Sequence, residues 1–543
     1  MEQILQGNLV DIPNRNIYYA EIHLEGQRIK EIRHLSENPN TAAHYICPGF
    51  VDAHVHIESS LLVPSAFAKL AVKHGTVATI SDPHEIANVC GEAGVEFMIE
   101  NGKAVPFKFH FGAPSCVPAT VFETAGAVLD LAAVKRLLER DDIYYLSEMM
   151  NFPGVLNGDP EVMAKIVAAQ ELGKPIDGHA PGLRGEQAAH YIAAGMSTDH
   201  ECFTYEEGLD KAQQGMKILI REGSAAKNFE ALIELLRTHP DQIMFCSDDK
   251  HPDSLLLGHI NQLCARAVTH ELDLFDVLKA ACVNPVEHYK MDVGLLREGD
   301  WADFVLLRDL EHFEVESTWI NGECVYENGE SRIPEIAVEP INQFHCSPIE
   351  QHTVFMPAVG TPLPAIVAYD GQLITGTREI SAADLVVQEG GWCSNPSNDL
   401  LKLVVVNRYQ PAPVAKAFIQ GFGLQQGAIA SSVAHDSHNI IAVGADDASL
   451  VEAINLVIRE QGGLSCVNAS ESAVLPLPVA GLMSADDGLE VAAAYTQIDT
   501  MAKAQGSRLS APFMTLSFMA LLVIPELKLS DRGLFDGRQF RFL

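Results

Sequence analysis

A strand-like apolar segment that ends in two closely spaced histidines constrains this chain more than any other feature. The segment runs Cys47-Pro-Gly-Phe-Val-Asp-Ala-His-Val-His56, so that one residue separates His54 from His56. Residues i and i+2 of a β-strand point to the same face, and both imidazoles can therefore bind one ion. Such a pair, taken alone, is more often two ordinary surface or core histidines. A turn at Pro48-Gly49 and a helical pattern from Ser65 to His74 place the pair at the end of a strand in a βα unit.

The same alternation of strand and helix continues from Phe50 to about Tyr289. Later strands are predicted at Gly75–Ser81, Phe107–Gly112, Ile143–Ser147, Pro175–His179, Met196–His200 and Gln242–Ser247, with helices at Leu129–Arg140, Asp159–Leu172 and Phe229–Thr238. Repeated βα units over this length are typical of a closed β/α barrel. We predict an α/β fold with a (β/α)8 TIM-like barrel over residues 48–290.

The two flanks of the predicted barrel read differently. Residues 1–47 and 291–335 contain short strands with turns at Glu25-Gly26 and Asn321-Gly322. We expect these segments to join in one small β-sandwich domain beside the barrel. A loop rich in proline and polar residues then separates a third region, residues 345–543, which mixes strands and helices and is long enough for a C-terminal α+β domain.

Composition narrows the class of partner. The net charge of −35 in 543 residues argues against nucleic acid, because the phosphates would be repelled. The eleven cysteines show no C-x-x-C pair, and the N-terminus lacks the basic start and apolar core of a signal peptide. The longest apolar stretch, Pro512–Pro525, is too short to cross a bilayer. We expect a cytoplasmic protein with reduced thiols, no membrane partner and a small-molecule substrate.

Further histidines and carboxylates occur at spacings that fit barrel strands. If His54 and His56 lie on strand 1, then Glu148, His179, His200 and Asp248 fall at the ends of strands 4, 5, 6 and 8. All would project into the C-terminal mouth of the barrel. Imidazoles with carboxylates suit a divalent ion that activates water, and one carboxylate between two ions can bridge them. The six residues predict a metal site, with Asp248 as the base that carries a proton from water to a leaving group.

Several motifs give this site a family resemblance. Pro48-Gly-Phe-Val-Asp-Ala-His-Val-His56 is similar to the strand-1 signature of the amidohydrolase superfamily, which many hydrolases share. More specific segments resemble the bacterial adenine deaminases over nearly the whole chain. They are Ile57-Glu-Ser-Ser60, Ser81-Asp-Pro-His-Glu-Ile-Ala-Asn-Val89, Leu146-Ser-Glu-Met-Met-Asn-Phe-Pro-Gly-Val155, Asp177-Gly-His-Ala-Pro181, Ser197-Thr-Asp-His-Glu201, Cys246-Ser-Asp-Asp249, Gly427–Asn439 and Met514–Leu521.

The resemblance implies hydrolytic deamination of adenine to hypoxanthine and ammonia by a metal-bound hydroxide, a step of purine salvage. It also implies two ions of Mn²⁺ or Fe²⁺ per chain. Carried over by position, His54, His56, Asp248 and Glu148 hold one ion, and Glu148, His179 and His200 hold the other. Many superfamily members use a carbamylated lysine where this chain has Glu148, which makes Glu148 a catalytic candidate together with Asp248. We also expect a homodimer.

Substrate contacts are expected after the second strand. Asp82, His84 and Glu85 lie there at the barrel mouth, where they can bond the purine ring nitrogens, with Glu85 the best candidate. Asp82 can equally cap the next helix. The cluster His435-Asp-Ser-His438 fits an extra metal site or a lid over the mouth, but we favour a structural or subunit-contact role for it.

Two other functions remain open from the residues. A cyclic-amide hydrolase of the dihydroorotase or hydantoinase type uses the same barrel, but such enzymes more often carry the strand-4 lysine. A non-catalytic scaffold derived from an amidohydrolase is the second alternative. Such scaffolds tend to lose metal ligands, whereas this chain keeps all six.

Overall fold

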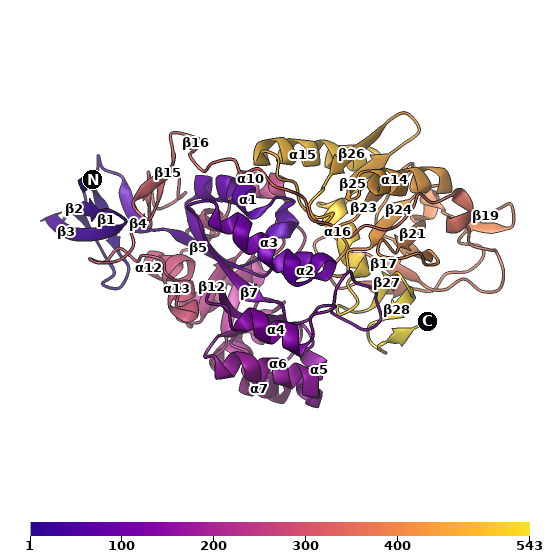
Figure 1. Cartoon of the computed structure of the whole chain (residues 1–543), viewed down its shortest axis with the longest axis horizontal. Helices are drawn as coiled ribbons and strands as arrows, with labels where there is room; N and C mark the ends of the chain where they lie inside the picture. The colour runs from indigo at the N-terminus through magenta and orange to yellow at the C-terminus, as the bar shows by residue number, and fades with distance from the viewer. Residues whose placement is uncertain (1) are drawn as a thin grey trace.

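The molecule is elongated, and three regions follow one another along its long axis (Figure 1). The computed structural model describes residues 2–543. The N-terminal strands lie at one end, the βα region lies in the middle, and the C-terminal region forms the other end (Figure 1). The order of these regions agrees with the order of the predicted segments.

Strands from both flanks of the barrel form one sheet of eight strands. Its order is β16-β15-β14-β13-β4-β1-β2-β3. The two flanks meet where β4 pairs with β1 in parallel and with β13 in antiparallel. The strands are β1 (Glu2–Asp11), β2 (Asn16–Glu25), β3 (Arg28–Ser36), β4 (Tyr45–Pro48), β13 (Phe304–Leu307), β14 (Val315–Ile320), β15 (Glu323–Glu327) and β16 (Glu330–Ser331). Strands from both flanks therefore share one continuous hydrogen-bonded sheet.

The middle region contains eight parallel strands that follow one another in sequence order. They are β5 (Phe50–Val55), β6 (Thr76–Ser81), β7 (Lys108–Ala113), β8 (Ile143–Met149), β9 (Ile176–Gly178), β10 (Thr198–Asp199), β11 (Lys217–Arg221) and β12 (Ile243–Cys246). Their side chains are almost all buried, because helices cover the outside and side chains fill the inside.

The hydrogen-bonded ladder of these strands is not closed into a complete barrel. Strands β5 to β9 form one sheet and β10 to β12 form another. A few backbone bonds join the two: Ser197 donates its N–H to the Ile176 carbonyl at 2.8 Å, and Asp248 donates to the carbonyl of His54 at 2.9 Å while its own carbonyl accepts from the His56 N–H. The predicted α/β barrel is therefore confirmed in its strand order and direction, but the closed ladder is not present.

Helices follow nearly every strand of the middle region. They are α1 (Pro64–Ala71), α2 (His84–Cys90), α3 (Glu92–Lys103), α4 (Leu131–Leu138), α5 (Phe152–Asn157), α6 (Pro160–Glu171), α7 (Gly185–Ala193), α8 (Tyr205–Gln213), α9 (Phe229–Leu232), α10 (Pro252–Leu257), α11 (Ile260–Thr269), α12 (Leu274–Leu278) and α13 (Asn284–Tyr289). Asp130 and Asp159 cap α4 and α6 through their side chains. Both helices lie within the predicted ranges.

The C-terminal region is a mixed α and β structure around an eight-stranded sheet with the order β18-β17-β22-β21-β24-β23-β25-β26. The strands of the whole C-terminal region are β17 (Ala365–Val367), β18 (Gly376–Arg378), β19 (Val386–Gln388), β20 (Gly391–Cys393), β21 (Leu401–Val406), β22 (Ala415–Gln420), β23 (Ala428–Ser431), β24 (Ile440–Gly444), β25 (Gly463–Val467), β26 (Ser472–Pro476), β27 (Leu527–Ser530), β28 (Gly533–Asp536) and β29 (Arg541–Phe542). Its helices are α14 (Asp447–Arg459), α15 (Gly488–Ala504) and α16 (Pro512–Ser517). The apolar stretch Pro512–Pro525 begins with α16, whose residues are all buried.

The C-terminal region packs directly on the barrel. Figure 1 shows α15 lying next to α10, and α16 lying beyond the end of α2. Lys69 of α1 bonds Asp487, the N-cap of α15, at 2.6 Å. None of the helices within residues 2–543 combines the length and the apolar character needed to cross a bilayer.

Candidate active site

The six predicted metal ligands gather at one end of the parallel strands. His54 lies on β5 with His56 just after it, and Glu148 lies near the end of β8. His179, His200 and Asp248 follow β9, β10 and β12. All six side chains are at least 95 % buried, so histidines and carboxylates converge in the interior of the molecule.

The spacing of the donor atoms fits a shared ion better than it fits direct hydrogen bonds. His54 Nε2 lies 3.2 Å from His56 Nε2, and these atoms lie 3.5 and 3.3 Å from Oδ1 of Asp248. Ligand atoms that surround one divalent ion at about 2.1 Å lie about 3.4 Å from one another. Hydrogen bonds are usually shorter, near 2.9 Å. The donor set of two imidazoles and a carboxylate therefore fits a metal ion.

Glu148 lies between two groups of histidines. Its Oε1 is 3.4 Å from Nε2 of His56, while its Oε2 is 2.7 Å from Nδ1 of His179 and 3.2 Å from Nε2 of His200. Burial raises the pKa of this carboxyl, but the nearby charges of His179 and His200 outweigh burial and hold the pKa well below its usual range. Each oxygen of the ionised carboxylate therefore faces a different set of imidazoles.

Nearby carboxylates raise the pKa of two histidines in the cluster. Burial alone lowers the pKa of His200, but the charges of Glu148 and Asp248 raise it. The pKa of His179 rises to about 9 against the effect of burial, through the charges of Glu201 and Glu148. Because a metal ligand must give up its proton, ion binding at these imidazoles becomes stronger as the pH rises.

Backbone geometry aims Asp248 at the cluster. Its φ of 56° lies in the left-handed region, which few non-glycine residues adopt. Its N–H donates to the His54 carbonyl, and its own carbonyl accepts from the His56 N–H at 3.3 Å. Strand β5 therefore fixes Asp248 directly beside the two histidines of the opening motif.

Arg221 is a site residue that the sequence analysis missed. It ends β11, a strand that was not predicted, and its guanidinium is fully buried. Nη1 donates to Oδ2 of Asp248 at 2.7 Å, and Nη2 donates to Oε2 of Glu201 at 3.0 Å. The spacing of two βα units between His200 and Asp248 already required a strand here, and Lys217-Ile-Leu-Ile-Arg221 is the apolar run that supplies it.

Glu201 follows His200 in the sequence and lies near two of the candidate ligands. Its Oε1 lies 3.5 Å from Nε2 of His200 and 3.7 Å from Nδ1 of His179. With its other oxygen on Arg221, Glu201 connects the guanidinium to two of the candidate ligands.

The predicted substrate residues lie on the neighbouring strand end. His84 approaches Oδ2 of Asp82 at 3.2 Å and Oε1 of Glu148 at 3.6 Å, so it lies beside the candidate metal ligands. Asp82 accepts the N–H of His84 at 3.1 Å, in the manner of a residue that starts a helix. Glu85, on α2, points instead to the C-terminal region.

The cluster at residues 435–438 covers the mouth of the barrel. His435 and His438 both bond Glu85, and all three side chains are buried within one chain. The cluster therefore links the C-terminal region to the barrel mouth through Glu85. Side chains from both regions line a cavity of about 20 Å³, room for about one water molecule. Its walls are His56, His84, Glu85, Glu148, Met150, His179, His200, Glu201, Asp248, Asp249, Leu373, His435, Asp436, Phe518 and Leu521.

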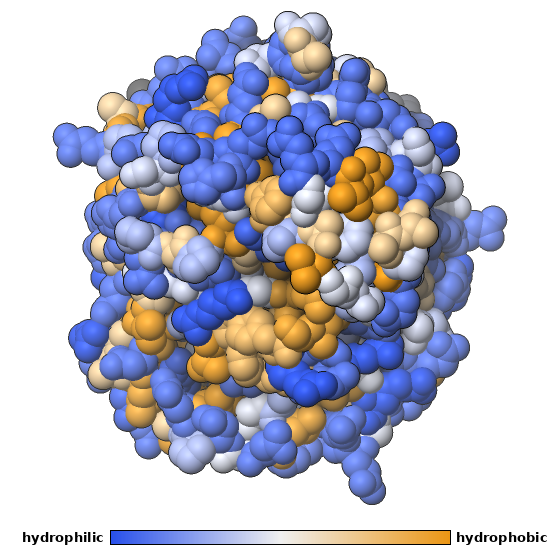
Figure 2. Space-filling model, turned by 90° about the vertical axis from the view of Figure 1, so that its right-hand side faces the viewer, coloured by the Kyte–Doolittle hydropathy of each residue, from blue (hydrophilic) through white to orange (hydrophobic). Residues whose placement is uncertain are grey.

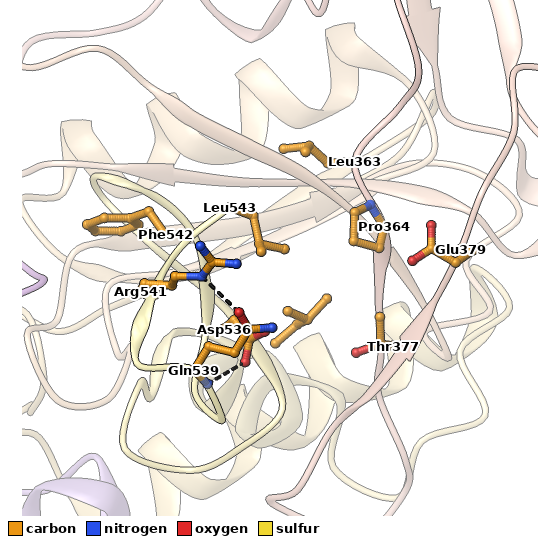
Figure 3. Close-up of a pocket in the computed structure, with 10 residues that line it drawn as sticks. Leu363, Pro364, Thr377, Glu379, Asp536, Gln539, Arg541, Phe542 and Leu543 are labelled. Carbon is orange, nitrogen blue, oxygen red and sulfur yellow. Dashed lines mark hydrogen bonds between the residues drawn. The ribbon is translucent and has the colours of Figure 1, made fainter.

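A larger cavity lies far from this chemistry. It measures about 530 Å³ and opens between Leu363 and the last residues of the chain (Figure 3). Its polar groups largely bond one another, as Arg541 does with Gln539 at 2.9 Å. The end of the molecule that the C-terminal region forms shows apolar side chains around a hollow (Figure 2). No histidine lines the larger cavity, so the enclosed cluster is the candidate active site.

Two protein families match most of the chain. The model of the amidohydrolase family matches residues 45–325, and the model of the adenine deaminase C-terminal domain matches residues 372–541. The chain is 54% identical over 541 residues to the adenine deaminase of Salinibacter ruber (strain DSM 13855 / M31), covering 99% of this chain and 98% of that protein. It is 55% identical over 540 residues to the adenine deaminase of Sulfurovum sp. (strain NBC37-1), covering 99% of both. The chain therefore belongs to the amidohydrolase family and, within it, to the adenine deaminases.

Proposed function

We propose that the chain hydrolyses adenine to hypoxanthine and ammonia in purine salvage. Relatives named as adenine deaminases match almost the whole chain at 54% and 55% identity, which supports this substrate. The observation that carries the chemistry is the position of Glu148, which faces His56 with one oxygen and His179 and His200 with the other. Such a buried carboxylate suits a pair of ions.

Two divalent ions, Mn²⁺ or Fe²⁺, are proposed for the cluster. His54, His56, Asp248 and Glu148 would hold one, and Glu148, His179 and His200 the other. The 3.2–3.5 Å separations among the first group support this assignment. When bound, such ions supply Lewis acidity and lower the pKa of a coordinated water toward neutrality.

Asp248 is proposed to move the proton. Hydrolysis at C6 takes a proton from water and delivers one to the departing amine, so a carboxylate beside both is needed. Burial raises the pKa of Asp248, but the charges of Arg221 and the neighbouring histidines hold it well below its usual range. The group is ionised before reaction, and Arg221 fixes the oxygen that does not face the histidines.

Asp82, His84 and Glu85 are proposed to form the substrate side of the cavity. His84 and Glu85 line it, and His84 lies within 3.6 Å of Glu148. Substrate bound against these residues is therefore close to the candidate metal ligands. The apolar wall made by Leu373, Phe518 and Leu521 suits the flat face of a base.

The proposal extends to the organisation of the protein. We assign residues 1–47 and 291–335 to the small β domain, 48–290 to the barrel and 345–543 to the C-terminal domain. The eleven cysteines are all free in the structure, which supports a reducing compartment such as the cytoplasm. Apolar side chains exposed at the C-terminal end, among them Val359, Leu363 and Val387, support the proposed homodimer.

The test is ammonia release by the full chain loaded with Mn²⁺ without oxygen. Adenine is the substrate, and dihydroorotate and hydantoin are offered separately to represent cyclic-amide hydrolases. We expect release from adenine, with hypoxanthine formed in equal amount and no turnover of the cyclic amides. Turnover of a cyclic amide without release from adenine would contradict the proposal.

A further inference from the structure

Glu85 of the barrel is held by two histidines of the C-terminal region. Nδ1 of His435 lies 2.6 Å from Oε1 of Glu85, and Nε2 of His438 bonds Oε2. The three side chains are 0–2 % exposed. None of them belongs to the six candidate metal ligands, yet Glu85 and His435 line the same cavity. The contact joins two regions separated by some 350 residues of sequence.

The hydrogen bonding of His438 argues against a third metal ion in this group. The backbone N–H of Ala434 donates to Nδ1 of His438 at 3.1 Å, so the lone pair of Nδ1 is used. A neutral imidazole then carries its proton on Nε2, which donates to Glu85. An ion would need the Nε2 lone pair, which this tautomer does not offer. Burial also lowers the pKa of His438, in keeping with a neutral ring.

His435 differs from His438, because one of its nitrogens is unused. Its ring is stacked on Phe518, with the ring centroids 4.5 Å apart and an angle of 12° between the ring planes. Nδ1 is bonded to Glu85, while Nε2 is buried and has no partner among the residues that the structure describes. Buried polar atoms in proteins are almost always paired. A buried, unpaired nitrogen in a cavity wall points to a ligand.

The surroundings of His435 favour a donor at that nitrogen. Burial alone lowers its pKa, but the charges of Glu85 and Asp249 raise the pKa of His435 to about 9. The other groups that face it are His438, whose pKa is lowered by burial, and the carboxylate of Asp436. With Nδ1–H bonded to Glu85, a protonated ring presents its second N–H to the cavity.

We propose that His435 is a substrate-binding residue that donates its Nε2–H to a ring nitrogen of the bound purine. Glu85 and His438 are positioning residues that fix the ring of His435. This inference rests on the proposed function. It transfers the substrate contact expected of Glu85 to the histidine that Glu85 holds, since both oxygens of Glu85 already accept hydrogen bonds.

Purine analogues that lack one ring nitrogen test the contact. In 1-deaza-, 3-deaza- and 7-deazaadenine a C–H replaces one of the three acceptor nitrogens of adenine. Inhibition constants of the three analogues are measured against the full-length, Mn²⁺-loaded wild-type protein and against His435→Asn. The Asn amide can take the place of Nδ1–H on Glu85, but nothing in it reaches the position of Nε2.

The expected pattern is selective. His435→Asn should weaken two of the analogues about 10- to 100-fold, the range for a hydrogen bond from a charged donor. The third analogue, which already lacks the accepting nitrogen, should be unaffected. A purely structural role of His435 would weaken all three analogues alike, and that result, like no weakening of any, overturns the proposal.

Further variants keep the test decisive. His435→Phe retains the stacking on Phe518 without a donor and takes the place of the Asn variant if that one fails to fold. His435→Gln, whose amide reaches toward the Nε2 position, should restore part of the loss. His110→Asn is the matched control, because His110 is a buried histidine bonded to Asp292 at 2.8 Å outside the enclosed cavity. Absence of ammonia release from adenine by the wild type would refute the proposed function itself, which separates the two failures.

Discussion

The guanidinium of Arg221 lies 2.7 Å from Oδ2 of Asp248, which lines the candidate active-site cavity. The same side chain bonds Glu201 with both terminal nitrogens. The buried guanidinium therefore bonds two buried carboxylates, and each carboxylate also lies near a histidine of the candidate metal site. The geometry of Asp248 depends on Arg221 as much as on its own strand.

Replacement of Arg221 should impair both activity and stability. Arg221→Met leaves Asp248 and Glu201 without their cation, and breaking a buried ion pair costs about 3–5 kcal/mol. We expect a fall in kcat/KM of about 10²-fold or more and a lower Tm. Arg221→Lys should give values of kcat/KM and Tm between those of the wild type and Arg221→Met, since an ammonium cannot bond both carboxylates as the planar guanidinium does. Ammonia release and thermal unfolding measure the two effects.

The matched control for Arg221 is Arg266. It also bridges two carboxylates, Glu222 and Glu230, but its side chain is 37% exposed and remote from the cavity. Arg266→Met should change kcat/KM little, because exposed ion pairs contribute about 0–1 kcal/mol. Equal losses in both variants would contradict the assigned role of Arg221.

Asp248→Asn should give a folded protein with little activity. The amide keeps the size of the side chain but cannot accept a proton, so we expect kcat to fall about 10²- to 10⁴-fold. Metal analysis of the same sample separates loss of proton transfer from loss of an ion. Activity close to that of the wild type would show that another group moves the proton.

Glu148→Gln should change the metal content. The neutral amide has only one carbonyl oxygen, so it cannot face both histidine groups with an acceptor as Glu148 does. Elemental analysis after dialysis should give two ions per wild-type chain and one or fewer per variant chain. Addition of Mn²⁺ should raise the Tm of the wild type, because the ion binds only the folded cluster. A single ion in the wild type, or two in the variant, would refute the bridging role.

Glu123 should make the stability of the protein depend on pH. Burial, with the nearby charges of Asp436 and Asp531, raises its pKa from 4.5 to about 8, although Thr120 bonds it at 2.9 Å. The pKa of Glu123 is higher in the folded protein than in the unfolded chain, so protonation of Glu123 favours the folded state. This contribution to the free energy of unfolding is complete below pH 4.5 and is lost as the pH rises through 8.

Glu123→Gln removes this dependence, because glutamine does not titrate. The Tm of the variant relative to the wild type should therefore rise by a few degrees between about pH 5 and pH 8.5. Thermal unfolding at both pH values, with Glu139→Gln as an exposed control, measures the difference. A constant difference between variant and wild type across this range would argue against a buried, protonated Glu123.

The clustering of the six candidate ligands could be predicted because these residues follow a simple rule of strand ends. His54 and His56 mark the end of the first strand. The number of residues in a βα unit then predicts the positions of Glu148, His179, His200 and Asp248. The rule works because parallel strands of a barrel all end at one face. The position of the ligands is thus a local property of each βα unit.

What could not be predicted depends on contacts between distant segments. Arg221 was missed because β11 is a five-residue strand whose charged end looks like a surface position, whereas its guanidinium is buried between Asp248 and Glu201. The interruption of the ladder between β9 and β10 follows from strands of only three and two residues, which pattern alone cannot resolve. The contact between His435 and Glu85 joins two regions far apart in the sequence, so it depends on the fold of both.

The small volume enclosed by the barrel and the C-terminal region has a kinetic consequence. A space of about 20 Å³ is smaller than a purine, so binding of the base requires side chains of the cavity wall to move. The barrel supplies the candidate ion ligands, whereas the C-terminal region supplies part of the wall of the same cavity. Substitutions in the covering region can therefore alter the rate of turnover while the candidate metal ligands stay unchanged.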